Sequence, residues 1–242
     1  VQARMGSTRL PDKVMMRIGN IPMIELLLSR LSKSEHITQV VVATSKNKNN
    51  LPLIDHVQSL GYEVYCGSEN DVLSRYYNAA KQTKADLVIR ITGDCPVIDS
   101  SLVDEVIEGF LNNKADYASN REPPTYPDGL DVEVVSIKAL EKAYKKAKED
   151  FEREHVTPYI INSDTSKKFY LKNSEDLSAE RWTVDEPEDL IVVKNIFNYF
   201  HPEINFSWKK IIELKENKPK LFTVNEHLIR NEGAVMSTGH KL

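Results

Sequence analysis

The stretch of sequence that decides the fold is residues 1–13, which read Val-Gln-Ala-Arg-Met-Gly-Ser-Thr-Arg-Leu-Pro-Asp-Lys. Residues 1–3 look like the end of a buried strand, and residues 24–31 downstream carry apolar side chains at helical spacing. A strand that ends at a polar loop, followed by a returning helix, is typical of α/β proteins that bind ligands at the carboxyl edge of a parallel sheet. Because a first parallel strand usually has about five apolar residues, we expect more of this strand before Val1.

The loop that follows has the chemistry of a triphosphate-binding site. Arg4, Arg9 and Lys13 flank a Gly-Ser-Thr run, so cations, hydroxyl groups and flexible backbone amides can all face one polyanion. The loop is neither a P-loop nor a dinucleotide-binding Gly-x-Gly-x-x-Gly turn. The alternative is a basic surface loop in which Gly6 and Pro11 only make the turn.

Composition and charge limit the class of protein. The 242 residues are 40% hydrophobic and contain no Pro/Gly/Ser-rich linker, which favours a single domain over residues 1–242. The net charge of −4 argues against a nucleic acid partner, and the lack of a long uncharged apolar run argues against a membrane-spanning segment. Cys66 and Cys95 cannot make a disulfide framework. With no signal peptide, they predict free thiols and a cytoplasmic protein.

Strand-like and helix-like patterns alternate through the first half of the chain. Apolar runs typical of strands occupy residues 39–43, 62–65 and 86–91, and amphipathic helical patterns occupy residues 22–34, 71–83 and 102–110. Asp71 and Ser100 are the expected N-caps of the second and third helices. The alternation predicts a three-layer α/β fold around a mostly parallel sheet.

The pattern changes after about residue 113. A short strand at residues 115–118, a turn-rich stretch at 121–129 and an alternating strand at 130–135 precede a mainly helical segment at 136–163. A further strand is expected at residues 169–171, and Pro187 begins a helix for which Asp185 is the expected N-cap. We expect residues 117–165 to form an excursion of strands and helices inserted into the α/β fold.

Two aspartates follow predicted strands and should lie at the same edge of the sheet as the opening loop. Asp94 comes at the end of Thr-Gly-Asp at residues 92–94, and Asp185 ends residues 181–185. Mg²⁺ takes carboxylate oxygens together with phosphate oxygens, so the pair predicts a magnesium site for an in-line displacement at phosphorus. The alternative is that both aspartates only cap turns or helices.

Several of these segments belong to longer blocks that resemble one enzyme family. The blocks are Gln-Ala-Arg-Met-Gly-Ser-Thr-Arg-Leu-Pro-Asp-Lys at 2–13, Val-Val-Ala-Thr-Ser at 41–45, Asn-Asp-Val-Leu-Ser-Arg-Tyr-Tyr at 70–77, Thr-Gly-Asp-Cys-Pro-Val-Ile-Asp at 92–99, Pro-Asp-Gly-Leu-Asp-Val-Glu at 127–133, Arg-Glu-His-Val-Thr-Pro-Tyr at 153–159 and Arg-Trp-Thr-Val-Asp-Glu-Pro-Glu-Asp-Leu at 181–190. Over almost its whole length the chain resembles the cytidylyltransferases that activate acidic sugars, among them the CMP-KDO and CMP-sialate synthetases. It is most similar to the branch named after spore-coat polysaccharide biosynthesis.

The resemblance implies a nucleotide-diphospho-sugar transferase (Rossmann-like) fold, CTP as the nucleotide, Mg²⁺ as the cofactor and a homodimer. It implies Arg4, Lys13 and Asp94 as catalytic residues and Asp94 and Asp185 as metal ligands. The nucleotide-binding residues that it implies are Arg4, Gly6, Ser7, Arg9, Lys13, Ala43, Thr44 and Arg75. The implied reaction is attack of an acceptor oxygen on the α-phosphorus of CTP with release of pyrophosphate, in surface-polysaccharide or glycoconjugate synthesis.

Two departures from the family pattern bear on the site. Around Asp94 the chain reads Thr-Gly-Asp-Cys-Pro where KDO synthetases read Gln-Gly-Asp-Glu-Pro, so residues that help to select the sugar differ. Asp12 stands where glycine is common in the branch, which places an anion near the phosphate loop.

The acceptor pocket is expected in the excursion. Asp131 and Glu133 alternate on one strand and can hydrogen-bond hydroxyl or amino groups, while Arg153 and His155 can meet an acidic group. The alternative is a solvent-facing edge strand and a histidine on a helix surface. Trp182 is expected to pack in the core. A dimer interface is expected at the aromatic residues of the excursion, namely Tyr126, Tyr144, Phe151 and Tyr159.

The main hypothesis is therefore a metal-dependent cytidylyltransferase whose partners are CTP and a small acidic sugar-like acceptor. A nucleotide-sugar-binding glycosyltransferase has a similar fold but usually carries an Asp-x-Asp motif, where this chain has Gly93-Asp94-Cys95. A third hypothesis is an inactive nucleotide-binding subunit. Pyrophosphate release from a nucleoside triphosphate in the presence of sugar acids separates the three.

Overall fold

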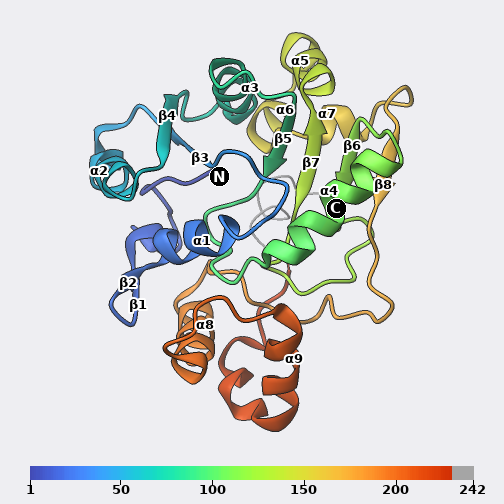
Figure 1. Ribbon diagram of the computed structural model, residues 1–242. Helices are drawn as coiled ribbons and strands as arrows, with labels where there is room; N and C mark the ends of the chain where they lie inside the picture. Colours follow the sequence, from blue (N-terminus) through green and yellow to red (C-terminus); the bar gives the residue numbers. More distant parts are fainter. Residues whose placement is uncertain (231–242) are drawn as a thin grey trace.

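Strands and helices are arranged in three layers in the computed structural model, which describes residues 1–230 (Figure 1). The strands are β1 (Arg17–Ile18), β2 (Ile21–Pro22), β3 (Val41–Ser45), β4 (Glu63–Gly67), β5 (Leu87–Arg90), β6 (Tyr117–Ser119), β7 (Glu133–Ser136) and β8 (Lys168–Tyr170). The α-helices are α1 (Met23–Leu31), α2 (Leu51–Ser59), α3 (Val72–Gln82), α4 (Ser100–Asn112), α5 (Ile137–Lys146), α6 (Asp150–His155), α7 (Pro158–Ile161), α8 (Pro187–Phe200) and α9 (Trp208–Asn217).

The sheet is mostly parallel, as predicted. β3 pairs in parallel with β4, and Gln2 forms parallel bridges to Ala43 on one side and Thr92, just beyond β5, on the other. Residues 1–3 therefore lie in the sheet between β3 and β5, as expected of a strand end. The order continues β5-β7-β6-β8, in which β7 runs antiparallel to both of its neighbours and β6 pairs in parallel with β8.

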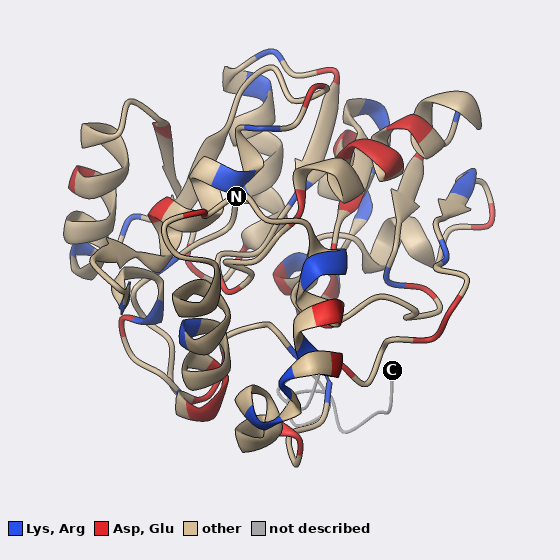
Figure 2. Cartoon of the chain, turned by 60° about the horizontal axis from the view of Figure 1, so that its bottom comes forward, with Lys and Arg blue, Asp and Glu red and all other residues tan. Residues whose placement is uncertain are grey.

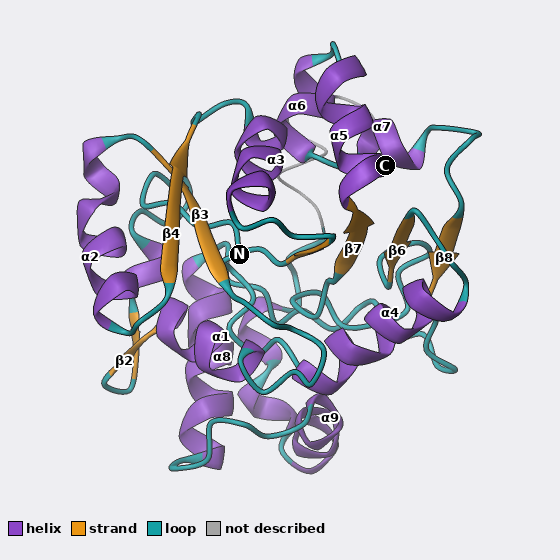
Figure 3. Cartoon of the chain, turned by 45° about the horizontal axis from the view of Figure 1, so that its top comes forward, coloured by secondary structure: helices purple, strands orange, loops and turns teal. Residues whose placement is uncertain are grey.

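Alternate residues of the strands face two separate helix layers. In β7, Val134 packs into a core that contains side chains of α1, α4, α8 and α9, while the next residue, Val135, packs into a second core with α3, α5 and α7. In β6, Ala118 and Tyr117 divide between the two cores in the same way. Figure 3 shows α3, α5, α6 and α7 gathered on one side of the strands. This period of two confirms the three-layer α/β fold.

The strands of the excursion belong to the central sheet and do not form a separate layer. β7 begins at Glu133, so residues 130–132, expected in this strand, precede it. Glu133 is opposite Arg90 of β5 and Ser119 of β6, and it is 1% exposed. The alternative of a solvent-facing edge strand is therefore wrong. Trp182 is fully buried, as predicted.

Two of the three predicted helix caps differ from the structure by one residue. The side chain of Asp71 accepts a hydrogen bond from the backbone N–H of Ser74 and caps α3, as predicted. Asp99, and not Ser100, caps α4, because its carboxylate accepts hydrogen bonds from two backbone N–H groups of the first turn. Likewise Glu186, and not Asp185, is the N-cap of α8, where it forms a capping box with Asp189.

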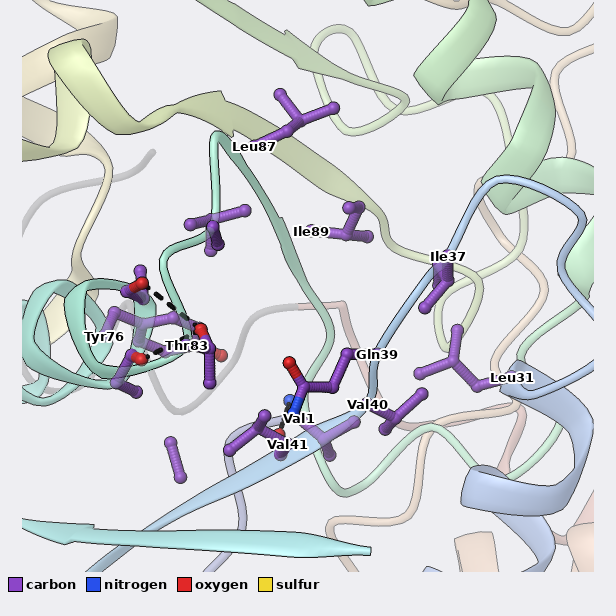
Figure 4. Close-up of a pocket in the computed structure, with 15 residues that line it drawn as sticks. Val1, Leu31, Ile37, Gln39, Val40, Val41, Tyr76, Thr83, Leu87 and Ile89 are labelled. Atoms are coloured by element: carbon purple, nitrogen blue, oxygen red, sulfur yellow. Dashed lines mark hydrogen bonds between the residues drawn. The ribbon is translucent and has the colours of Figure 1, made fainter.

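A small apolar hollow of about 100 Å³ lies between β3, α3 and β5, beside Val1 (Figure 4). Val41, Tyr76 and Leu87 are among the residues that line it. Its described side chains carry no charge, so it offers no anchor for a phosphate or a sugar acid.

Charged residues of both signs are interspersed along the helices and loops (Figure 2). No helix within residues 1–230 is long and apolar enough to span a membrane. Cys66 and Cys95 are free thiols, as predicted.

Candidate active site

The opening loop is a compact turn that ends in a short 3-10 helix at Lys13–Met15. The backbone N–H groups of Ser7 and Asp12 both donate to the carbonyl of Met5, at 2.9 and 3.1 Å. The N–H of Met5 donates to Oδ1 of buried Asn50 at 2.8 Å, which ties the loop to the segment before α2. Asp12 has a φ of 58°, in the left-handed region that favours glycine and that aspartate also enters. This backbone requirement explains why glycine suits the position.

Lys13 lies between the two predicted metal ligands. Its Nζ donates to Oδ1 of Asp185 at 2.7 Å and to Oδ2 of Asp94 at 3.3 Å. Burial would lower the pKa of Lys13, but the two carboxylates outweigh burial and raise it. Burial would likewise raise the pKa of Asp94, but Lys13 and hydrogen bonds from Thr92 and Cys95 lower it to about 2. The lysine is therefore an ammonium between two carboxylates.

The two aspartates fit a hard divalent cation. Their oxygens already face one positive charge, the ammonium of Lys13, and carboxylate oxygens are preferred ligands of Mg²⁺. Within residues 1–230, no cluster of three or more acidic, His or Cys side chains forms a metal site. A magnesium ion at Asp94 and Asp185 would thus complete its coordination with phosphate oxygens and water, as is usual for this ion.

The predicted phosphate ligands divide between two sides of the loop. Arg9 forms ion pairs with Asp185 and Glu186, each at 3.1 Å, and so joins the cluster around Lys13. Arg4 is 45% exposed in its side chain and lies 3.8 Å from Glu69, in the segment between β4 and α3. Gly6 is exposed beside the same glutamate, and Ser7 is half-buried, with its hydroxyl accepting from the N–H of Leu10.

The residues expected near the base and ribose lie in or beside β3. Ala43 and Thr44 are buried at its carboxyl end, and the hydroxyl of Thr44 has no hydrogen-bond partner among residues 1–230. Arg75 is 1% exposed, and its Nη1 donates to the carbonyl of Ser68 at 2.6 Å. This hydrogen bond ties Arg75 to the segment between β4 and α3. Direct contact of Arg75 with a nucleotide stays a prediction.

A cavity of about 480 Å³ adjoins the Asp94 and Asp185 carboxylates. This is within the usual size of small-ligand sites. Its walls come from β5, the loop after β5, β6, the segment 121–131, the start of β7, α6, α7 and the segment before α8. The residues that line it are Arg90, Thr92, Asp94, Cys95, Tyr117, Arg121, Glu122, Pro124, Asp128, Asp131, Glu133, Phe151, His155, Thr157, Pro158, Ile161, Asn162, Thr183, Asp185 and Arg230.

One wall of this cavity is a chain of alternating charges. Glu133 pairs with Arg90 and, at 3.4 Å, with Arg121, and Asp131 pairs with Arg121 at 3.2 Å and with Arg230. We call Arg90, Glu133, Arg121, Asp131 and Arg230 the charge row. The hydroxyls of Tyr117 and Thr157 both donate to Oε1 of Glu133 at 2.7 Å. Every carboxylate oxygen of Glu133 therefore already has a partner.

Three of the four residues predicted to bind the acceptor line the cavity, namely Asp131, Glu133 and His155. Burial, with Arg90 and Arg121, lowers the pKa of His155. Arg153 does not line the cavity. Its guanidinium donates to the carbonyl of Tyr144 at 2.8 Å and to the carboxylate of Asp71. Asp131 and Glu133 act mainly on arginines, which is a different use from the predicted contact with sugar hydroxyls.

Sequence reasoning missed the arginines of the charge row and Asp128. Arg90 could have been found, because it ends the strand that leads into residues 92–94. Arg121 and Asp128 lie in the turn-rich stretch, where no pattern separates a ligand from a turn residue. Burial and the nearby Asp131 raise the pKa of Asp128 to about 7, although Arg230 and Arg181, whose Nη1 lies 3.5 Å from its Oδ2, oppose this shift.

The segment before α8 is fixed by a buried ion pair. Arg181 donates to both oxygens of Asp189, each at 2.8 Å, and the N–H of Asp185 donates to Oδ2 of Asp189 at 2.9 Å. Gly129 lies against this segment with a φ of +103°, and a Cβ there would lie 2.6 Å from the backbone nitrogen of Thr183. These contacts orient Asp185 toward Lys13.

Comparisons with known proteins identify the family of the chain. The profile of the family described as Cytidylyltransferase matches residues 1–228. The spore coat polysaccharide biosynthesis protein SpsF of Bacillus subtilis is 31% identical over 234 residues, which cover 93% of this chain and 96% of that protein.

Solved structures are similar as well. A cytidylyltransferase from Leptospira borgpetersenii has a TM-score of 0.88 and 35% identity over 91% of this chain and 94% of that chain. A CMP:2-keto-3-deoxy-manno-octonic acid synthetase solved with CTP has a TM-score of 0.63 at 18% identity, over 82% and 97% of the two chains, and so shares the fold. With the family profile matching nearly the whole chain, this protein belongs to the cytidylyltransferase family and is a nucleotidyltransferase.

Proposed function

We propose that this protein transfers the cytidylyl group of CTP to an oxygen of a small acidic sugar and releases pyrophosphate. The observation that carries the proposal is the cluster of Lys13, Asp94 and Asp185, whose two aspartates line the 480 Å³ cavity. The cluster offers cationic and anionic groups for a metal-bound triphosphate, and the cavity has room for a sugar next to it. The similarity to SpsF supports a role in surface-polysaccharide or glycoconjugate synthesis.

The chain's own residues would act by orientation and charge. Arg4, Arg9 and Lys13 supply three cations in one loop for the phosphates of CTP, and Arg9 and Lys13, which are held by ion pairs, would stabilise the charge that develops on the leaving pyrophosphate. Asp94 and Asp185 would hold Mg²⁺, which when bound neutralises phosphate charge and helps to align the displacement. Such transfers need little covalent help from the protein.

We expect CTP to raise the melting temperature more than ATP, GTP or UTP does, with magnesium present in every sample. A ligand that binds only the native state stabilises it by mass action, by about 2.7 kcal/mol at 100 times its Kd. Differential scanning fluorimetry at equal nucleotide concentrations measures the four shifts. Equal shifts for all four nucleotides would contradict the choice of CTP.

Pyrophosphate release from CTP with a panel of sugar acids then tests the reaction itself, and its absence would favour an inactive nucleotide-binding subunit.

A homodimer is part of the proposal. Two of the four aromatic residues that we expected at its interface instead pack against side chains of the same chain. Tyr126, expected at the interface, is 4% exposed and packs edge-on against Trp208, and Tyr144 stacks on Tyr77 at 4.4 Å between ring centroids. Phe151 and Tyr159 are half-buried and are the remaining aromatic candidates for the interface. We expect light scattering at micromolar concentration to give twice the mass of 27.6 kDa. A monomer would count against the dimer.

The free thiols of Cys66 and Cys95 support a cytoplasmic location.

A further inference from the structure

The charge row has one positive charge more than it has negative charges. Arg90, Arg121 and Arg230 are three cations, while Glu133 and Asp131 are two anions, so one positive charge is left over. Arg121 is the central member, since both acids pair with it. Glu133 and Asp131 raise its pKa above the usual range, so Arg121 is always charged.

Within the charge row, Arg121 has the most exposed side chain of the three arginines. Its side chain is 32% exposed, compared with 11% for Arg90 and 13% for Arg230. Arg90 donates to Gln2 as well as to Glu133, and Arg230 donates to the carbonyl of Tyr126 as well as to Asp131. The ion pairs of Arg121 use Nε and Nη1, and no residue from 1 to 230 accepts a hydrogen bond from its Nη2.

The cavity in front of Arg121 also reaches the reacting end of the site. Asp94, Thr183 and Asp185 line the same cavity. Outside the charge row two further acids line the cavity, Glu122 and Asp128, and Asp128 is paired with Arg181. A sugar in this cavity can therefore place an oxygen near the two aspartates and an anionic group on Arg121.

We propose that Arg121 binds the carboxylate of the acceptor and is the residue by which the enzyme selects an acid over a neutral sugar. Asp131 and Glu133 would not touch the sugar but would fix the plane of the guanidinium. A clamped guanidinium loses little side-chain freedom on binding, and its planar fork matches the two oxygens of a carboxylate. This inference deepens the proposed function and depends on it.

The test compares acids with their neutral amides. The probes are 3-deoxy-manno-octulosonate and sialic acid, each beside its C1 carboxamide, and the readout is pyrophosphate release from CTP with magnesium. The variants are Arg121→Gln, which removes the charge, Arg121→Lys, which keeps it, and Arg17→Gln, a matched control at an exposed arginine of β1. CTP-induced thermal shifts report whether each variant still folds and binds nucleotide.

We expect the parent to prefer the acid over its amide by roughly 10- to 100-fold in KM, the usual effect of a charge-assisted hydrogen bond. Arg121→Gln should lose this preference through the KM of the acid, with the KM of CTP unchanged. Arg121→Lys should keep part of it and Arg17→Gln all of it. The inference is overturned if the parent has no preference for the acids, or if Arg121→Gln keeps the parent's preference.

Failure of the proposed function has a different signature. No CTP-dependent pyrophosphate release with any acid or amide would remove the cytidylyl transfer, and Arg121 with it. Release with the amides as fast as with the acids would remove only the role of Arg121.

Discussion

Replacing Asp94 or Asp185 by Asn is expected to lower the rate of pyrophosphate release by about 100-fold or more. Losing one preorganised electrostatic group at a reacting centre commonly costs 10²- to 10³-fold in kcat. Asn keeps the size of the side chain but removes a charge that faces Lys13 and that would hold Mg²⁺. Steady-state assays at saturating CTP and magnesium measure the loss.

The same substitutions should leave the protein folded. Neither aspartate caps α8, and Lys13 keeps one carboxylate partner in each variant, so we expect a loss of about 2 kcal/mol in the free energy of unfolding. Binding of CTP without metal should survive through Arg4, Arg9 and Lys13. Asp55→Asn, at an exposed position of α2, is the matched control and should retain full activity. A rate for Asp185→Asn within a few-fold of the parent would disprove the two-carboxylate site.

Replacing Glu133 by Gln is expected to destabilise the protein by about 3 to 5 kcal/mol, the usual cost of removing one partner from a buried ion pair. The side chain of Glu133 is 1% exposed and faces Arg90, Arg121 and two hydroxyl donors. A small protein has only about 5 to 15 kcal/mol of stability in total, so the change is large. Urea unfolding followed by circular dichroism measures it.

Lowering the pH should weaken the ion pairs of Glu133 with Arg90 and Arg121. Burial alone would raise the pKa of Glu133, but Arg90 and Arg121 lower it to about 2. Since an unfolded glutamate titrates near pH 4.3, this group stabilises the fold above that pH, and the stabilisation is lost as the pH falls toward 2. The parent should therefore lose more stability than Glu133→Gln between pH 4.5 and 2. Glu141→Gln, in an exposed pair with Lys145, should behave as the parent does. A change of less than about 1 kcal/mol in Glu133→Gln at pH 7 would show that the charge row does not hold the fold.

Local patterns were enough to predict the strands that lead to the opening loop and to Asp94, but the strand expected before Asp185 does not form in residues 181–185, where only Arg181 makes a bridge, to Asp128. The opening loop and Asp94 each follow a strand-like run, and parallel strands bring their carboxyl ends to one edge. The sequence therefore predicted that Lys13, Asp94 and Asp185 would lie close together, although it could not show that the lysine sits between the carboxylates. The two wrong caps are shifts of one residue between adjacent acceptors, which helix boundaries commonly show.

Pairing between strands was not accessible to the same reasoning. The meeting of Arg90 with Glu133 depends on the register of β5 against β7, two strands separated by α4 and β6 in the chain. The stretch at residues 121–129 reads only as turns, so nothing in it distinguished Arg121 as a partner of two acids. Residues of the excursion could thus be placed near the site but not given their partners.

The antiparallel direction of β7 has a consequence for how such an enzyme can diversify. β6 ends at Ser119, and β7 begins at Glu133 opposite it, so the connecting residues 120–132 leave and re-enter the sheet at the same edge. That connection carries Arg121, Asp128 and Asp131, whereas the loop for the triphosphate belongs to residues 3–13. We therefore expect exchanges near Arg121 to change which acceptor is bound with little effect on the nucleotide, whereas Asp128 and Gly129 contact residues 181–183 and are tied to the segment that orients Asp185. On this proposal, the specificity for the acceptor and the specificity for the nucleotide are carried by different segments of one sheet.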